Sequence, residues 1–145
     1  MEINPAAPAR AERDVEIAAP IEIVWDVLSN VQDWPRWNDE VDSTAMTGPT
    51  APGTEFRWKP GRGTIKSRIE SADRPHHLAW TGHTFGISAI HVWRLEREEG
   101  RTRVKTEESM EGLPARLLRG TTQKNLDKSL DGWLRNLKAE CERRS

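Results

Sequence analysis

Apolar and polar residues alternate with a period of two through most of this chain, and one long amphipathic segment follows them. The alternation occurs in seven short segments, at residues 13–17, 41–47, 54–59, 64–71, 77–82, 87–96 and 102–110. This period is typical of β-strands that bury one face. Turn residues such as Gly and Pro separate several of the later segments. We therefore expect an antiparallel sheet of seven strands, with the first strand beside the last.

Helical spacing occurs outside the alternating segments. After Pro20, the residues Ile21, Val24, Trp25 and Leu28 form one apolar stripe, which predicts a short helix. We interpret residues 31–37 as a second short helix or a tight turn. A long helix is expected from residue 114 to about residue 141. Its apolar face consists of Leu126, Leu130, Trp133, Leu134, Leu137 and Cys141.

The charged residues indicate how these elements pack. Charges of both signs occupy alternate positions along the strands, which is typical of a sheet face in contact with water. The opposite face must be covered, and only the C-terminal helix is large enough to cover it. The sequence therefore predicts an α+β fold in which a curved antiparallel sheet wraps around one long helix and leaves a hollow between them.

Length and composition exclude several classes of protein. The chain has 145 residues, which suits one domain at residues 13–145 after a flexible tail at residues 1–12. A net charge of −1 argues against a nucleic-acid partner. With one cysteine and no HExxH motif, we expect no metal and no cofactor. The chain has no apolar run of about 20 residues and no leader-like start, so we expect no membrane span and a cytoplasmic location.

Several segments resemble one known superfamily. Residues 15–28, VEIAAPIEIVWDVL, resemble the opening of START-like proteins, also called SRPBCC. The following Trp34-Pro35-Arg36-Trp37 is similar to their W-x-x-W segment, residues 75–82 to their strand after a proline turn, and residues 91–96 and 100–109 to their last hairpin. The most similar branch contains polyketide cyclase/dehydrase and lipid-transport-like proteins, and the resemblance covers residues 13–142.

This resemblance implies a helix-grip fold, as in START and Bet v 1-like proteins, with a cavity between the sheet and the C-terminal helix. It implies no single activity. Members of the superfamily bind lipids, hormones or polyketides, and only some are enzymes.

His91 and Glu108 are the main polar candidates, because their strand faces are otherwise mostly apolar. If Leu95 pairs with Thr102 across the last hairpin, His91 lies opposite Thr106, one step from Glu108. A histidine beside a carboxyl group in an apolar cavity suits acid–base catalysis or ligand orientation. A buried pair that only satisfies its own hydrogen bonds explains the same residues.

Aromatic residues on the inward strand faces indicate what the cavity would hold. They suit an apolar, ring-containing ligand, although a solid core would use the same residues. The expected ligand-binding residues are Phe56, Trp58, Ile69, Trp80, His91, Trp93, Thr106, Glu108, Met110, Leu117 and Thr121. The last two are candidates for a gate at the head of the long helix, and an ordinary solvated helix start explains them equally well.

Three classes of function fit these features. The first is binding or transport of a small apolar molecule, such as a lipid, polyketide or aromatic compound. The second is a polyketide cyclase/dehydrase-like enzyme that uses the same cavity. The third is a protein-interaction module. We favour the binding protein, and the sequence leaves its oligomeric state open between monomer and dimer.

Overall fold

A single antiparallel sheet is the main element of the computed structural model, which describes residues 1–145. Its strands lie in the order β1-β7-β6-β5-β4-β3-β2, and every neighbouring pair is antiparallel. This confirms the seven-stranded sheet with its first strand beside its last. The strands are β1 (Ala9–Ile17), β2 (Ser43–Met46), β3 (Glu55–Lys59), β4 (Ile65–Asp73), β5 (His77–Thr84), β6 (Ile87–Glu98) and β7 (Arg101–Glu111).

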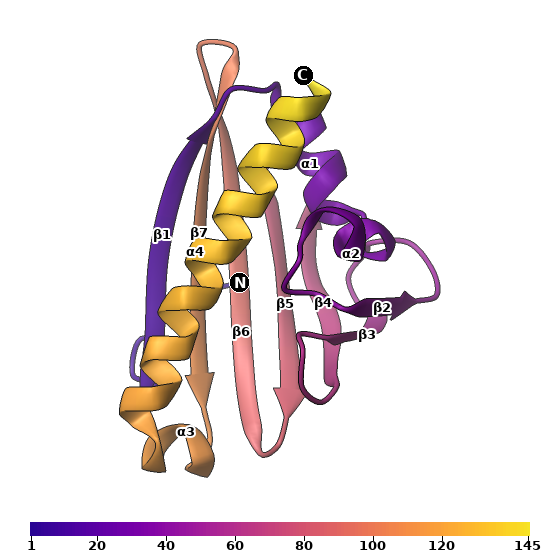
Figure 1. The fold of residues 1–145 in the computed structure, drawn as a ribbon. Coiled ribbons are helices and arrows are strands. Elements are labelled where there is room, and N and C mark those ends of the chain that lie inside the picture. Colours follow the sequence, from indigo (N-terminus) through magenta and orange to yellow (C-terminus); the bar gives the residue numbers. More distant parts are fainter.

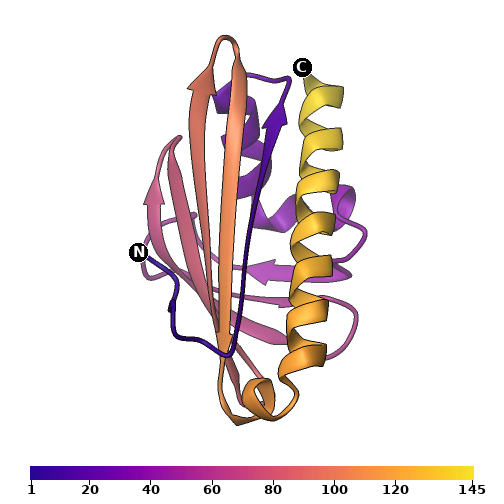
Figure 2. The same cartoon turned by 90° about the vertical axis from the view of Figure 1, so that its left-hand side faces the viewer.

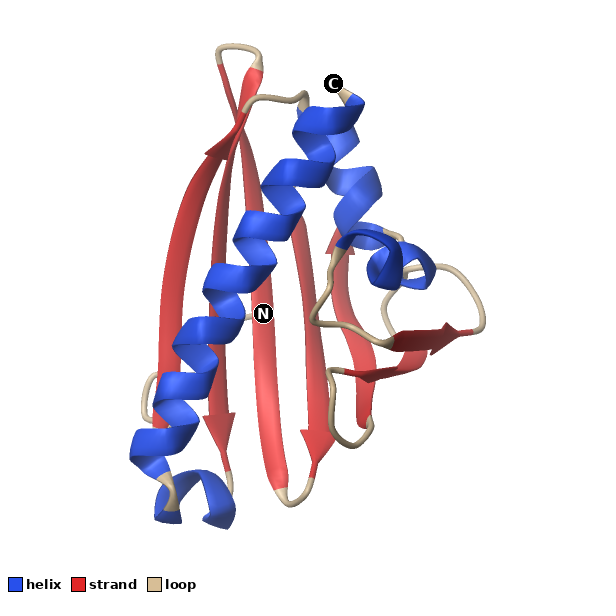
Figure 3. Ribbon diagram, in the orientation of Figure 1, coloured by secondary structure: helices blue, strands red, loops and turns tan.

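The helices lie on one face of this sheet. They are α1 (Ile21–Ser29), the 3₁₀ turn η1 (Val31–Asp33), α2 (Trp34–Trp37), α3 (Leu113–Leu117) and α4 (Arg119–Arg144). Figure 1 shows α4 running diagonally across the sheet, and the turned view in Figure 2 shows that it stands off one face. In Figure 3, α1 and α2 lie on that same side, beside the C-terminal half of α4. The predicted grip of a sheet on a long helix is confirmed.

The first strand begins earlier than the sequence predicted. The expectation of a tail at residues 1–12 is wrong for residues 9–12, because β1 starts at Ala9. Ala9 and Ala11 are buried against Leu126 and Leu130 of α4. Alanines carry this part of the period-two pattern, and their small apolar surface makes the signal weak. They also allow α4 to approach β1 closely.

The C-terminal helix is two helices instead of one. The chain leaves helical geometry at Leu118, where φ is −110° and ψ is 42°, so α3 ends at Leu117 and α4 starts at Arg119. The short α3 lies at the end of β7, and the break turns the chain back along the sheet. An apolar periodicity can continue through such a break, which is why the pattern predicted one helix from Pro114.

Side-chain size divides the space between the sheet and α4 into two halves. On β5 the inward-facing series passes from Trp80 to Gly82, and on β6 it passes from Trp93 to Ala89. The half nearer the C-terminus of α4, which we call the packed half, is filled by large side chains. Its buried residues include Ile17, Val24, Leu28, Trp34, Ile69, Leu78, Trp93, Leu95, Val104, Leu137 and Cys141. The other half, with its smaller side chains, is hollow.

Candidate functional site

The hollow half contains a cavity of about 430 Å³. Its walls come from the loop after α2, from strands β3 to β7 and from the N-terminal half of α4. The lining residues are Glu40, Trp58, Pro60, Ile65, Ser67, Trp80, Gly82, Thr84, Ile87, Ala89, His91, Glu108, Met110, Asn125, Leu126, Lys128, Ser129 and Trp133. This volume lies in the range of small-molecule sites. Most of the lining surface is apolar, and eight polar side chains also contribute to it.

Aromatic rings close the cavity toward the packed half. Trp133 of α4 lies at the centre, with its ring centroid 4.9 Å from that of Trp34, 6.0 Å from Trp58 and 6.1 Å from Trp80. The indole Nε1–H of Trp58 donates a hydrogen bond to Ser67 Oγ at 3.1 Å. That bond holds the Trp58 ring in place. The cavity is therefore bounded by an aromatic wall on the side of the packed half.

His91 and Glu108 meet at the sheet wall of this cavity. They are direct cross-strand partners, so the expected position of His91 opposite Thr106 is wrong. The hairpin turn consists of Glu99 and Gly100 alone, with Glu98 paired to Arg101, and this shifts the register by two residues from the expected one. Glutamate is an unusual residue for such a tight turn, which is why the sequence suggested a longer connection.

Hydrogen-bond directions fix the proton positions in this pair. The Thr106 hydroxyl donates to the Val92 carbonyl at 3.1 Å, so its oxygen accepts from the Nε2–H of His91 at 2.8 Å. His91 Nδ1 is then an acceptor, and it lies 3.3 Å from Oε1 of Glu108. Two acceptors at this distance need a proton between them. The pair therefore shares one proton.

Burial decides where that proton resides. His91 is 2% exposed, and removal from water lowers the pKa of its imidazole to about 3. The same cause raises the pKa of the Glu108 carboxyl to about 8. At neutral pH Glu108 is therefore protonated and donates to a neutral His91. The Glu108 side chain keeps 11% of its surface exposed, on the cavity side.

A second carboxyl group, from Glu40, reaches the cavity from the loop after α2. It occupies space that a side chain at position 132 would fill, because the Glu40 carboxyl lies against Gly132 of α4. This explains a glycine in the middle of a long helix. Oε2 of Glu40 is buried without a hydrogen-bond partner, and burial raises the pKa of this carboxyl. The sequence pattern did not indicate Glu40, since a loop position carries no periodic signal.

Five of the predicted ligand-binding residues line the cavity: Trp58, Trp80, His91, Glu108 and Met110. A sixth, Thr106, lies behind the wall and positions His91. Three others are packed into the core beside the cavity, namely Phe56, Ile69 and Trp93. The two gate candidates do not line it. Leu117 is 71% exposed on α3, and Thr121 is exposed near the start of α4.

Small residues on inward positions also line the cavity and were missed. Ser67, Gly82 and Ala89 lie on the sheet, and Ser129 lies on α4. Their signal was present in the sequence, because small side chains replace large ones where a strand face should be apolar. The prediction relied mainly on large aromatic side chains and therefore did not include these small residues.

Comparison with known proteins identifies the family of this chain. The family described as polyketide cyclase / dehydrase and lipid transport matches residues 8–142. The chain belongs to this family. The START-like membership that the sequence indicated is thereby confirmed. No curated protein matches the sequence.

Solved structures share the fold of this family member at low sequence identity. A hypothetical protein, jhp0584, from Helicobacter pylori has a TM-score of 0.83 at 20% identity, over 94% of this chain and 90% of that one. The Zhui aromatase/cyclase from a Streptomyces strain has a TM-score of 0.81 at 16% identity, over 93% and 94%. A START superfamily protein from Mycobacterium smegmatis has a TM-score of 0.80 at 14% identity, over 94% and 99%. At these identities the similarity establishes the helix-grip fold alone.

Proposed function

We propose that this protein binds a small apolar, ring-containing ligand in the cavity between the sheet and α4. The observation that carries the proposal is the cavity itself, which combines an aromatic wall with the buried His91–Glu108 pair. Membership of a family described by lipid transport and polyketide cyclisation agrees with an apolar ligand. Trp58 and Trp80 would contact its rings, and most of the affinity would come from apolar surface removed from water.

The polar pair on the wall indicates which substituent the ligand carries. Oε1 of Glu108 faces His91, so Oε2 is the oxygen left for a ligand. In a protonated carboxyl that donates through Oε1, Oε2 is a carbonyl-type acceptor. The site therefore suits a phenol or another hydroxyl that donates to Glu108. A carboxylate at this position would meet an acceptor without a proton and would be disfavoured.

Calorimetric titration with 2-naphthol and with 2-methoxynaphthalene tests both parts of this proposal. We expect both to bind, and the naphthol to bind about two- to tenfold more tightly, because its hydroxyl makes one additional hydrogen bond. His91→Ala should weaken naphthol binding by roughly tenfold or less, whereas Trp58→Ala should cost more through lost apolar contact. Equal affinities for the two probes would contradict the role given to Glu108.

A filled cavity provides the matched control. Ala89 points into the cavity from β6, and Ala89→Leu places three extra carbons in that space. Ala45 is exposed on β2, so Ala45→Leu adds the same atoms away from the cavity. We expect the first variant to lose probe binding and the second to keep it, with both folded by circular dichroism. If Ala89→Leu binds like the wild type, the ligand site lies elsewhere.

A cyclase/dehydrase-like enzyme is the second candidate, and the shared proton of His91 and Glu108 favours it. A carboxyl group that remains protonated at neutral pH is an acid that could donate to a substrate oxygen, with His91 as the adjacent base. Under this alternative Glu108→Gln would abolish turnover of a polyketide-like substrate and leave its binding intact. Under the binding proposal no turnover is detected with either protein.

A further inference from the structure

Exposed large apolar side chains gather at one end of the molecule, which we call the lower end after its place in Figure 1. It consists of the β5–β6 turn (residues 85–86), the β3–β4 turn (residues 60–64), α3 and the α3–α4 junction. Leu113, Leu117 and Leu118 are 66%, 71% and 61% exposed, and Phe85 is 76% exposed. Met1 is the one other large apolar residue of the chain with comparable exposure.

Unpaired cations accompany these apolar residues. No Asp or Glu lies between Glu111 and Asp127, a stretch that contains Arg116 and Arg119, and none lies between Glu55 and Glu70, a stretch that contains Arg62 and Lys66. None of these four cations forms an ion pair, although most other basic residues of the strands and helices do. The lower end therefore has an excess of positive charge, with the exposed Glu111 near Arg116 at its border, in a chain whose net charge is −1.

The aromatic residue at this end, Phe85, has a strained backbone conformation and lies against the neighbouring turn. Phe85 has a φ of 47°, a left-handed conformation that bulky residues rarely adopt. Its ring lies against Gly63 of the β3–β4 turn, where a Cβ atom would come within 2.6 Å of the ring. The two turns thus support each other. The exposed ring therefore has one side against the β3–β4 turn and the rest in solvent.

The cavity reaches the same end. Thr84 and Ile87 line it, and the exposed Phe85–Gly86 turn is the only chain between them. Leu126 also lines it, in the first turns of α4. An apolar molecule held in a lipid layer against the lower end would therefore face the cavity without crossing bulk water.

We infer that the lower end docks on the surface of an anionic lipid bilayer. Single apolar side chains that protrude from separate elements, with unpaired cations around them, match the way peripheral proteins insert into the boundary between headgroups and acyl chains. A protein partner would more commonly require a continuous, shape-complementary patch. No helix of the chain is long and apolar enough to cross a membrane. Docking of this kind is peripheral and involves no crossing.

Co-sedimentation with vesicles tests the inference. The probe is a vesicle made of equal parts phosphatidylcholine and phosphatidylglycerol, and pure phosphatidylcholine is the comparison. We expect binding to the anionic vesicles that weakens as salt is added. The paired change Arg116→Glu with Arg119→Glu should reduce partitioning by at least about tenfold, since each cation near an anionic surface contributes about fivefold. Leu117→Ser with Leu118→Ser should reduce it by about tenfold or more.

A double charge reversal at the C-terminal end of α4 is the control. Arg143→Glu with Arg144→Glu reverses the same number of charges far from the lower end, at residues that pair with Glu140, and should bind vesicles like the wild type. The leucine double variant should still bind 2-naphthol in solution, which separates a failure of docking from a failure of the proposed function. Absence of vesicle binding, or equal loss in the control, would overturn the inference. A wild-type dimer by ultracentrifugation that Leu117→Ser with Leu118→Ser dissociates, without vesicle binding, would assign the patch to a second copy of the chain.

Discussion

Two hairpin turns at opposite ends of β6 have the same backbone geometry and opposite chemistry. In the β5–β6 turn Phe85 and Gly86 have φ values of 47° and 76°, and in the β6–β7 turn Glu99 and Gly100 have φ values of 48° and 83°. Both are two-residue turns that require left-handed conformations at each central position. The lower turn presents an apolar ring and the upper turn presents a carboxylate. Because the backbone of the two turns is alike, the side chains alone decide whether each end is apolar or charged.

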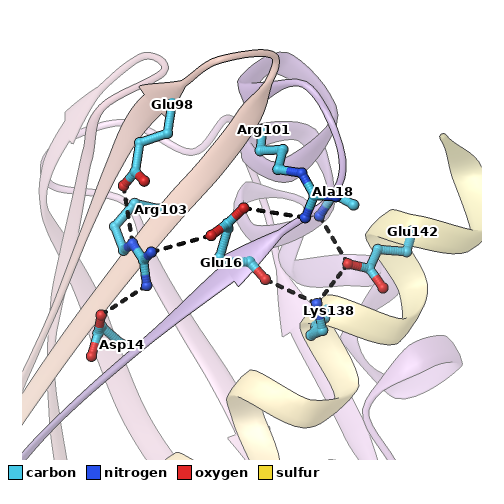
Figure 4. Close-up of polar contacts among 8 residues, drawn as sticks. All are labelled: Asp14, Glu16, Ala18, Glu98, Arg101, Arg103, Lys138 and Glu142. Atoms are coloured by element: carbon cyan, nitrogen blue, oxygen red, sulfur yellow. Dashed lines mark hydrogen bonds and ion pairs between the residues drawn. The ribbon is translucent and has the colours of Figure 1, made fainter.

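The surroundings of the two turns also differ, because ion pairs surround the upper turn and none form such a network at the lower turn. Figure 4 shows the end around the β6–β7 turn, where Arg103 pairs with Asp14 at 3.1 Å, Glu16 at 3.3 Å and Glu98 at 3.0 Å. Lys138 of α4 also donates to the Glu16 carbonyl at 2.9 Å. These contacts tie β7, β1 and α4 together beside the packed half. The lower end lacks such a network and adjoins the cavity. Ion pairs connect the elements at the upper end, whereas the lower end has unpaired cations and an adjoining cavity.

The largest expected effect tests whether the aromatic boundary between the two halves carries more stability than the wall of the hollow half. Trp133 is 2% exposed at their boundary, and Trp133→Ala should lower the free energy of unfolding by about 3–5 kcal/mol. Met110 lines the cavity and is only partly buried, so Met110→Ala should cost about 1–2 kcal/mol, below the range for a filled core. Urea unfolding of both variants checks this. Equal costs would mean that Met110 on the cavity wall contributes as much as Trp133 at the boundary.

The shared proton of the cavity wall makes stability depend on pH. The pKa of Glu108 is raised from 4.5 to about 8 by folding, and that of His91 is lowered from 6.5 to about 3. Between pH 4.5 and 6.5 folded and unfolded chains hold one proton each on this pair, so its contribution is constant. Above pH 6.5 the folded chain holds one proton more, and stability falls up to pH 8. Below pH 4.5 the unfolded chain holds one more, and stability falls again.

Glu108→Gln tests this account, because its amide donates to His91 at every pH. The fall above pH 6.5, on the order of 2 kcal/mol by pH 8, should disappear in this variant. The neighbouring change Glu107→Gln, on the outer face beside Arg94, should leave the fall in place. Thermal unfolding across the pH range measures it. Strong destabilisation of Glu108→Gln at pH 6 would instead indicate a charged ion pair between His91 and Glu108.

The two hairpin turns can be compared directly by placing the same residue in each. Asparagine tolerates left-handed geometry, so Glu99→Asn should stabilise the protein by about 0.5 kcal/mol through relief of strain. Phe85→Asn should have almost no net effect on stability, because the stability gained by relief of backbone strain is offset by the lost contact between the ring and Gly63. Only Phe85→Asn should weaken vesicle binding. Thermal unfolding and co-sedimentation of both variants separate the two roles.

A small effect is also expected at the ion-paired end. Lys138→Ala removes a pair with Glu142 at 2.7 Å and the bond to the Glu16 carbonyl. These groups remain partly in water, so the loss should be about 1 kcal/mol or less. Urea unfolding at low and high salt checks this, with the difference from wild type decreasing as salt is added. A loss that approaches that of Trp133→Ala would show that the network carries as much stability as the aromatic core.

The sequence by itself determined which segments are strands and helices, and which face of each is apolar. Period-two alternation predicted all seven strands, and helical spacing predicted that α4 covers the sheet. These features are local, because the pattern of side chains along one segment decides which face avoids water. The same reasoning placed Trp58, Trp80, His91, Glu108 and Met110 on the inward side, where the structure has them.

Tertiary structure alone decided which inward residues face a cavity and which fill the core. Trp93 and Ala89 share one face of β6, yet the first is packed in the core and the second lines the hollow half. The outcome depends on what α4 and the loop after α2 place opposite each position, as with Glu40 against Gly132. The direct pairing of His91 with Glu108 likewise followed from a turn two residues long. Register and volume arise from contacts between segments far apart in the chain, which no local pattern encodes.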